Sequence, residues 1–249
     1  MSESERREVA RVWGARERIE RQAGDLFAGL AEDLEATGES GELVALARQA
    51  SRDEGRHAAR CRDLARHFAA PVPALAVAQP PRLGPPGLPR GQRALFTSVA
   101  LSCVTETLST ALLFDLRRRA VDPMVRATVN EILRDEVDHA RVGWRHLAAA
   151  ARRSSVAWLS PHLPAMLRAA IGAAASPGPP AAAAEPRAAD PHSAAPATVD
   201  PLLAGYGVLP RADAVGIMRD AAVQVLFPGL ERFGIDPREA AAGRFVPGG

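Results

Sequence analysis

The sequence predicts an all-α protein made of two antiparallel helical hairpins, joined by a long crossover and followed by a C-terminal helical extension. Ala, Leu, Arg and Glu are abundant while Val, Ile, Thr, Tyr and Phe are sparse, which favours helices over strands. Four long segments carry apolar residues at helical spacing, and their connections alternate short, long, short. We expect a bundle at 1–152, a short helical extension at 153–175, a disordered linker at 176–200 and a helical segment at 201–249.

The first hairpin is predicted from two helices at about 4–36 and 41–70. The turn between them, "TGESGE", contains the glycine and polar residues that end one helix and begin the next. The second helix stops before "PVP", because proline cannot continue the hydrogen-bonding pattern. A turn this short requires the two helices to run antiparallel.

The second hairpin is predicted from helices at about 92–119 and 123–152, joined by the short "AVDP" turn with Pro123 in a favourable first-turn position. The Pro- and Gly-rich stretch 71–91 separates the hairpins. Fully extended, it reaches roughly 70 Å, whereas a helix of about 25 residues is only about 38 Å long. The crossover can therefore run the length of the bundle, which is the ferritin-like arrangement.

Composition excludes several classes of protein. The 249 residues carry a net charge of only +2, too little to suggest nucleic acid as the main partner. Lysine is absent, which removes Schiff-base and P-loop chemistry. Cys61 and Cys103 cannot form a CxxC pair or a disulfide framework, so we expect a reduced, cytoplasmic setting. We find no signal peptide and no run of 18 apolar residues, and therefore expect no membrane span.

One cluster of acids and histidine occurs twice, as "DEGRH" at 53–57 and "DEVDH" at 135–139. When the apolar seam of each predicted helix is followed in steps of four and three, Glu54 and His57 fall on one seam and Glu136 and His139 on the other. A single Glu-x-x-His is weak evidence, since such pairs also occur on solvated faces. Two of them on matched core seams indicate a buried polar site.

The remaining two helices each add one glutamate, Glu20 and Glu106, to the same layer of the bundle. Four carboxylates and two imidazoles cannot be buried as free charges, and two divalent metal ions would offset them. Oxygen and imidazole ligands without thiolate suit iron, manganese or a mixed iron–manganese pair. The alternative is a set of acids that form ordinary ion pairs with arginine.

Asp53 and Asp135 stand beside the predicted ligands. Each can accept a hydrogen bond from the ring N–H of a ligand histidine on the neighbouring helix, which would select the tautomer of the ring. The alternative is a solvated acid paired with Arg56 or Arg134. His146 lies two turns beyond His139 on the seam, and we interpret it as a hydrogen-bonded core histidine rather than a ligand.

With these motifs, residues 1–152 resemble the ferritin-like di-iron carboxylate superfamily, which includes rubrerythrins, bacterioferritins, ribonucleotide reductase small subunits and bacterial multicomponent monooxygenases. "DEGRH" is similar to the Asp-Glu-x-Arg-His signature of the monooxygenase branch, although "DEVDH" has Asp138 where that branch often has Arg. The resemblance implies a site for two iron ions, O2 as co-substrate, a small organic substrate, an electron donor such as a ferredoxin or a reductase, and a homodimer.

The resemblance also suggests two catalytic residues. Thr110 is similar in placement to the active-site threonine of the hydroxylases, and Cys61 stands where reductase small subunits carry a radical tyrosine; small core filler is the alternative for both. Small neighbours such as Ala50, Cys103 and Gly143 would leave room for a substrate or O2.

Three functions remain open at this stage. An O2-activating oxidase or oxygenase is the first. Iron oxidation or peroxide detoxification, as in ferritins and rubrerythrins, is the second; against a rubrerythrin, Ser109 stands where the additional glutamate is expected. A non-catalytic helical adaptor is the third. Against a close relation to the di-iron N-oxygenases, Ile132 stands where they carry an added histidine.

Overall fold

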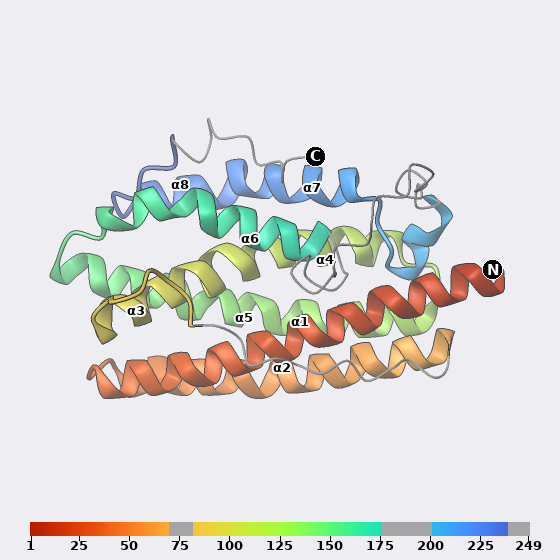
Figure 1. Ribbon diagram of the computed structural model, residues 1–249, viewed down its shortest axis with the longest axis horizontal. Helices are drawn as coiled ribbons and strands as arrows, with labels where there is room; N and C mark the ends of the chain where they lie inside the picture. Colours follow the sequence, from red (N-terminus) through yellow and green to blue (C-terminus); the bar gives the residue numbers. More distant parts are fainter. Residues whose placement is uncertain (70–81, 176–200, 239–249) are drawn as a thin grey trace, which may run out of the picture.

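The protein is helical wherever its structure is described. The computed structural model describes residues 1–69, 82–175 and 201–238, and no strand occurs in these ranges. The long helices lie side by side along one axis (Figure 1). The all-α prediction is therefore confirmed.

The first hairpin consists of α1 (Glu3–Ala36) and α2 (Gly41–Phe68), which run antiparallel. Ser2 and Glu5 form a capping box at the start of α1, and the Ser40 side chain caps α2 by accepting a hydrogen bond from the Leu43 N–H. Apolar side chains of both helices meet near the turn, among them Phe27, Leu34 and Leu43. The bounds differ from the prediction by one residue at the start of α1 and by two at the end of α2.

The second hairpin contains a helix type that the sequence pattern did not predict. The expected single α-helix is α3 (Arg90–Thr97), the π-helix η1 (Ser98–Glu106) and α4 (Thr107–Arg119) in unbroken succession. Within η1, Thr105 Oγ1 donates to the carbonyl of Ala100 five residues earlier, at 3.0 Å. The return helix is α5 (Pro123–Arg153), capped by Asp122. π-Helical turns inside α-helices are rare and are frequently found at functional sites.

α2 ends at one end of the helical array and α3 begins at the other, so the connection between them has to span its length (Figure 1). Residues 70–81 of that crossover lie outside the described residues. The predicted disordered linker 176–200 and the last part of the C-terminal segment, 239–249, lie outside them as well.

The C-terminal extension forms a further layer on the second hairpin. It comprises the 3₁₀ turn η2 (Ala157–His162), α6 (Leu163–Ala175), η4 (Pro201–Tyr206), α7 (Arg211–Ala221), the π-helical η5 (Ala222–Leu226) and α8 (Phe227–Glu231). Pro161 lies inside η2, and α6 begins directly after this turn, at Leu163. α7 packs against α4 and α6, and Leu167 and Leu226 share one core with Leu108 of α4. The sequence left open whether this segment contacts the bundle or a partner; in the structure it contacts the bundle.

Within the described ranges, one helical stretch has the length and composition that a membrane span would need. It is Arg90–Arg119, with a mean hydropathy of 1.4 over the relevant window. Because 56% of that window is buried inside the protein, a core helix accounts for the same composition.

Candidate metal centre

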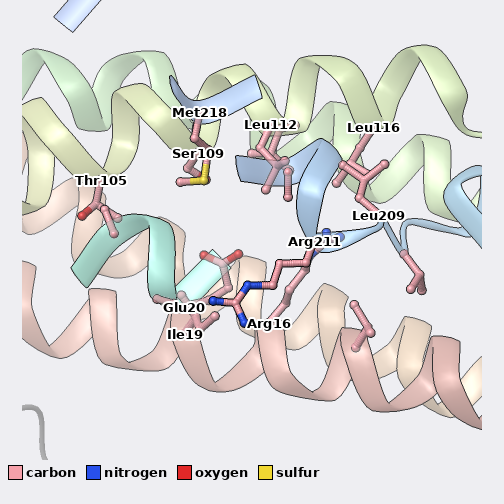
Figure 2. Close-up of a pocket in the computed structure, with 16 residues that line it drawn as sticks. Arg16, Ile19, Glu20, Thr105, Ser109, Leu112, Leu116, Leu209, Arg211 and Met218 are labelled. Carbon is pink, nitrogen blue, oxygen red and sulfur yellow. The ribbon is translucent and has the colours of Figure 1, made fainter. Parts of the chain in front are cut away.

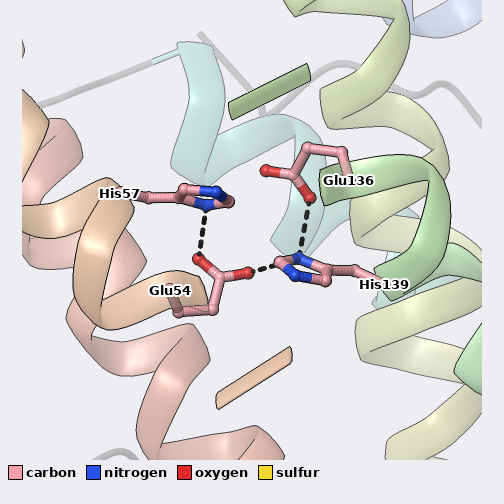
Figure 3. Close-up of side chains that lie close together, drawn as sticks. All are labelled: Glu54, His57, Glu136 and His139. Atoms are coloured by element: carbon pink, nitrogen blue, oxygen red, sulfur yellow. Dashed lines mark ion pairs between the residues drawn. The ribbon is translucent and has the colours of Figure 1, made fainter. Parts of the chain in front are cut away.

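The two Glu-x-x-His pairs meet in the core between α2 and α5. Glu54, His57, Glu136 and His139 are each at most 1% exposed, and one ligand atom from each lies within 4.8 Å of the others (Figure 3). His139 Nδ1 is 2.9 Å from Glu54 Oε1 and 3.3 Å from Glu136 Oε2, while His57 Nδ1 is 3.5 Å from Glu54 Oε2. This buried cluster could hold a metal ion.

Glu20 and Glu106 adjoin the same cluster from the other two helices. The Glu20 carboxyl of α1 lies beside Glu54, and the Glu106 carboxyl at the end of η1 lies beside Glu136. Glu106 is 3% exposed, whereas Glu20 is half-buried because one side of it faces a cavity. The structure thus groups four of the six predicted ligands, Glu54, His57, Glu136 and His139, and places Glu20 and Glu106 beside them.

Close packing of like charges distorts the proton affinities of the cluster. Burial raises the pKa of Glu20 well above its ordinary value, and the neighbouring Glu54 raises it further; burial and Glu136 do the same to the pKa of Glu106. Burial alone would lower the pKa of His139, but Glu136 and Glu54 raise it to about 11. Burial would likewise raise the pKa of Glu54, but His139 and His57 lower it to about 2. The four carboxylates of the cluster therefore have too few positive charges near them to neutralise all of them.

Several buried oxygen and nitrogen atoms of the cluster, each able to bind a metal ion, make no hydrogen bond with the described residues. They are both carboxylate oxygens of Glu54, Oε1 of Glu106, Oε2 of Glu136, Nδ1 of His57 and both ring nitrogens of His139. Some of these atoms approach one another closely, yet none has hydrogen-bonding geometry. Buried polar atoms without partners are rare and costly. Their convergence on one small space is the arrangement expected of ligands that share metal ions.

Asp53 and Asp135 contact the histidine of the opposite helix. Asp135 Oδ2 on α5 is 3.0 Å from His57 Nε2 on α2, and Asp53 Oδ2 on α2 is 3.5 Å from His139 Nε2 on α5. The half-exposed Arg56 forms ion pairs with both aspartates, at 2.9 Å in the case of Asp135. The predicted hydrogen bond is therefore present between Asp135 and His57, whereas Asp53 and His139 lie close without one; both aspartates also form ion pairs with Arg56 rather than with Arg134.

The two residues suggested as catalytic lie close to the cluster without contacting its donor atoms directly. The Thr110 hydroxyl donates to the carbonyl of Glu106 at 2.7 Å, and Thr110 does not line the cavity beside Glu20. Cys61 is fully buried, and burial raises the pKa of its thiol well above the ordinary value, with Glu20 adding to the effect. A protonated Cys61 thiol follows from this environment.

Gly143 does not leave free room near the site, which corrects the sequence-based expectation. A Cβ atom placed on Gly143 would lie 2.5 Å from the Ser98 carbonyl oxygen and 2.8 Å from the Cys103 backbone nitrogen. The missing side chain is instead what allows α5 and the π-helix η1 to approach each other. Cys103 is likewise packed in the core shared with α6.

His146 is hydrogen-bonded away from the cluster. Its Nδ1 is 2.8 Å from Ser98 Oγ, and its Nε2 is 3.5 Å from Glu39 Oε1. Burial lowers the pKa of His146, which favours the neutral ring. Its placement agrees with the interpretation as a core histidine.

A cavity of about 110 Å³ opens beside Glu20 between α1, α4, α6 and α7 (Figure 2). Its polar lining consists of Arg16, Glu20, Thr105, Ser109 and Arg211. Sequence reasoning did not identify this cavity, because α7 and residues 208–209 form one of its walls and no local pattern places them there. The seam position of Arg16, among apolar residues of α1, was the only signal in the sequence.

Comparison with known proteins adds no assignment to this geometry. No family model matches the chain, and no curated protein or solved structure shows significant similarity to it.

Proposed function

We propose that the protein is a di-metal oxidoreductase of the ferritin-like type, which uses O2 to oxidise a small organic substrate. The observation that carries this proposal is the meeting of two Glu-x-x-His pairs, with ligand atoms within 4.8 Å of one another in the buried core. Four carboxylates and two imidazoles from four helices are the ligand set of di-iron and di-manganese bundles.

The donor set fits two divalent ions of iron or manganese. Two such ions balance four carboxylate charges, which the histidines alone leave uncompensated. Oxygen and imidazole donors without thiolate favour iron, manganese or a mixed pair over a structural zinc site. Cys61 and Cys103 do not alter this choice, because neither belongs to the group of donor atoms that converge.

The surrounding residues orient the ligands and exclude water. Asp135 accepts the Nε2–H of His57, so the Nδ1 lone pair of His57 faces Glu54 and the centre of the cluster. Phe27 packs against His139 with ring centroids 5.5 Å apart, and the fully buried Ile132 lies one turn before Glu136. Two ferrous ions bound here would supply the electrons that reduce O2, and a ferredoxin or a reductase would restore them.

The two alternatives predict different surroundings for the acids. An adaptor with no metal would pair its buried acids with arginine, but within the described ranges no arginine forms an ion pair with Glu54, Glu106 or Glu136. Iron storage or peroxide detoxification would use the same six ligands. The cavity that reaches Glu20 favours an organic substrate over iron as the substrate, because its walls are mostly apolar.

Metal analysis tests the site directly. Protein reconstituted with ferrous iron under anaerobic conditions should hold two ions per chain, and His57→Ala or Glu136→Ala should abolish loading of at least one position. Glu17→Ala is the matched control for Glu20→Ala and should leave metal loading unchanged, since Glu17 forms ion pairs with Arg21 and Arg62 and not with the cluster. A folded wild-type protein that binds no metal would overturn the proposal and favour the adaptor.

The reaction with O2 separates an oxygenase from an iron store. When the ferrous protein is mixed with air, we expect a limited burst of O2 consumption that stops until a reductant is added. The burst is limited because two ferrous ions release only two electrons when they are oxidised to ferric ions. Stopped-flow absorbance and an iron count after repeated ferrous additions measure this. Continued oxidation with many ferric ions accumulated per chain would instead assign the protein to iron handling.

A further inference from the structure

The cavity beside Glu20 has an apolar body and a cationic side. Its apolar walls include Leu112 and Leu116 from α4, Leu209 from the segment before α7, and Met218 from α7 (Figure 2). The volume of about 110 Å³ is of the same order as an engineered apolar cavity that binds benzene. The cavity therefore accommodates an apolar group of about one ring, and anything longer extends through its mouth.

Arg16 brings a positive charge into this apolar space. Its guanidinium lies 4.5 Å above the centre of the Trp13 ring, which holds the group in place. Its Nη1 atom is buried and makes no hydrogen bond to the described part of the chain. Glu20 stands one turn along α1, yet the structure records no ion pair between these two residues, whose side chains both line the cavity (Figure 2).

A buried guanidinium nitrogen without a partner is costly, so an anion that enters the cavity would gain a charge-assisted hydrogen bond. Arginine suits a carboxylate best, because its planar fork matches the two oxygens. The exposed Arg211 adds a second positive charge to the lining. The walls formed by Leu112, Leu116 and Leu209 then surround whatever apolar group the carboxylate carries.

We infer that this cavity binds a small apolar carboxylic acid, with its carboxylate on Arg16 and its apolar group among Leu112, Leu116 and Leu209. The inference rests on the proposed function in one respect: because Glu20 both lines the cavity and adjoins Glu54, the bound acid is the substrate of the proposed metal centre. Binding of the acid itself requires only Arg16 and the apolar walls.

Calorimetry on the wild-type protein tests the inference with pairs of acids and alcohols of the same shape. Benzoate, phenylacetate and hexanoate are compared with benzyl alcohol, 2-phenylethanol and hexanol. We expect at least one acid to bind about tenfold or more tightly than its alcohol, since a hydrogen bond to a charged group has that effect. Arg16→Gln should remove the preference and Arg16→Lys should keep part of it. Arg18→Gln is the control, because Arg18 donates to the Gly14 carbonyl and does not line the cavity.

A second variant keeps the test decisive if Arg16→Gln does not fold. Ser109→Phe places a ring in the cavity and should abolish binding of acids and alcohols alike, with circular dichroism as the check of folding. Equal binding of acid and alcohol to the wild type, or an unchanged preference in folded Arg16→Gln, would overturn the inference. Metal content is measured on the same samples: two ions per chain without acid binding defeats this inference alone, and acid binding without metal defeats its link to the metal centre.

Discussion

Replacing Gly143 by alanine should loosen the contact between α5 and the π-helix η1. The new Cβ atom would lie 2.5 Å from the Ser98 carbonyl oxygen, 2.7 Å from Ser102 Cβ and 2.8 Å from the Cys103 nitrogen. Two of these three atoms belong to the backbone, so no change of rotamer relieves the overlap and the helices must separate. Overpacking of this kind costs about 1–3 kcal/mol, and up to about 1 kcal/mol is recovered because alanine favours the helix.

With the middle of both ranges the net loss is about 1.5 kcal/mol, which lowers the melting temperature by roughly 3–6 °C in a protein of this size. Metal loading should also weaken, since α5 carries Glu136 and His139 whereas η1 ends in Glu106. Thermal melting and metal content are measured on the same samples. Gly29→Ala is the control, because a Cβ on this exposed residue of α1 meets nothing within 4 Å and should stabilise by roughly 0.5–1 kcal/mol. A Gly143→Ala protein as stable as the wild type would refute the argument.

Two further substitutions test the surroundings of the cluster. Asp135→Asn should reduce metal affinity about 10- to 100-fold, because His57 loses its carboxylate partner; Asp138→Asn, at an exposed pair with Arg141, should not change it in the same titration. His146→Gln should flatten the acid side of the stability–pH curve. Burial lowers the pKa of His146 in the folded state, so the unfolded chain binds more protons and the wild type loses stability as the pH falls below about 6.5. Urea unfolding measures the free energy of unfolding of both proteins at pH 7.5 and 5.5. If the wild type and His146→Gln lose the same amount of stability between these pH values, His146 does not have this role.

The ends of the helices could be predicted because their signals are local. Ser40 caps α2, and Asp122 with Pro123 starts α5; each acts within one turn of its own position. The cluster could be predicted for a related reason. A helix of regular spacing places Glu54 and His57 on one face, and matched distances from two short turns place all four glutamates at one depth.

The π-helix and the cavity could not be predicted in the same way. "SVALSCVTE" has the composition of an ordinary buried α-helix, and the close approach of Gly143 from another helix is not visible in it. The cavity wall formed by Leu209 and Met218 depends on where the C-terminal extension packs. The sequence left that undecided, and with it the role of Arg16.

The two sides of the cluster differ in a way that only the folded chain reveals. On the side of α2 and α5, Asp135 and Arg56 form a polar edge that reaches solvent, their side chains being 26% and 50% exposed. On the side of α1 and α4, Glu20 faces the cavity, where Arg16 places a buried, unpaired guanidinium nitrogen among apolar walls. The polar edge formed by Asp135 and Arg56 is thus in contact with water, while the cavity beside Glu20 is separate from it. Substitutions at Arg56 and Arg16 should therefore have separable effects: the first acts on the histidines through their aspartates, and the second acts on what the cavity binds.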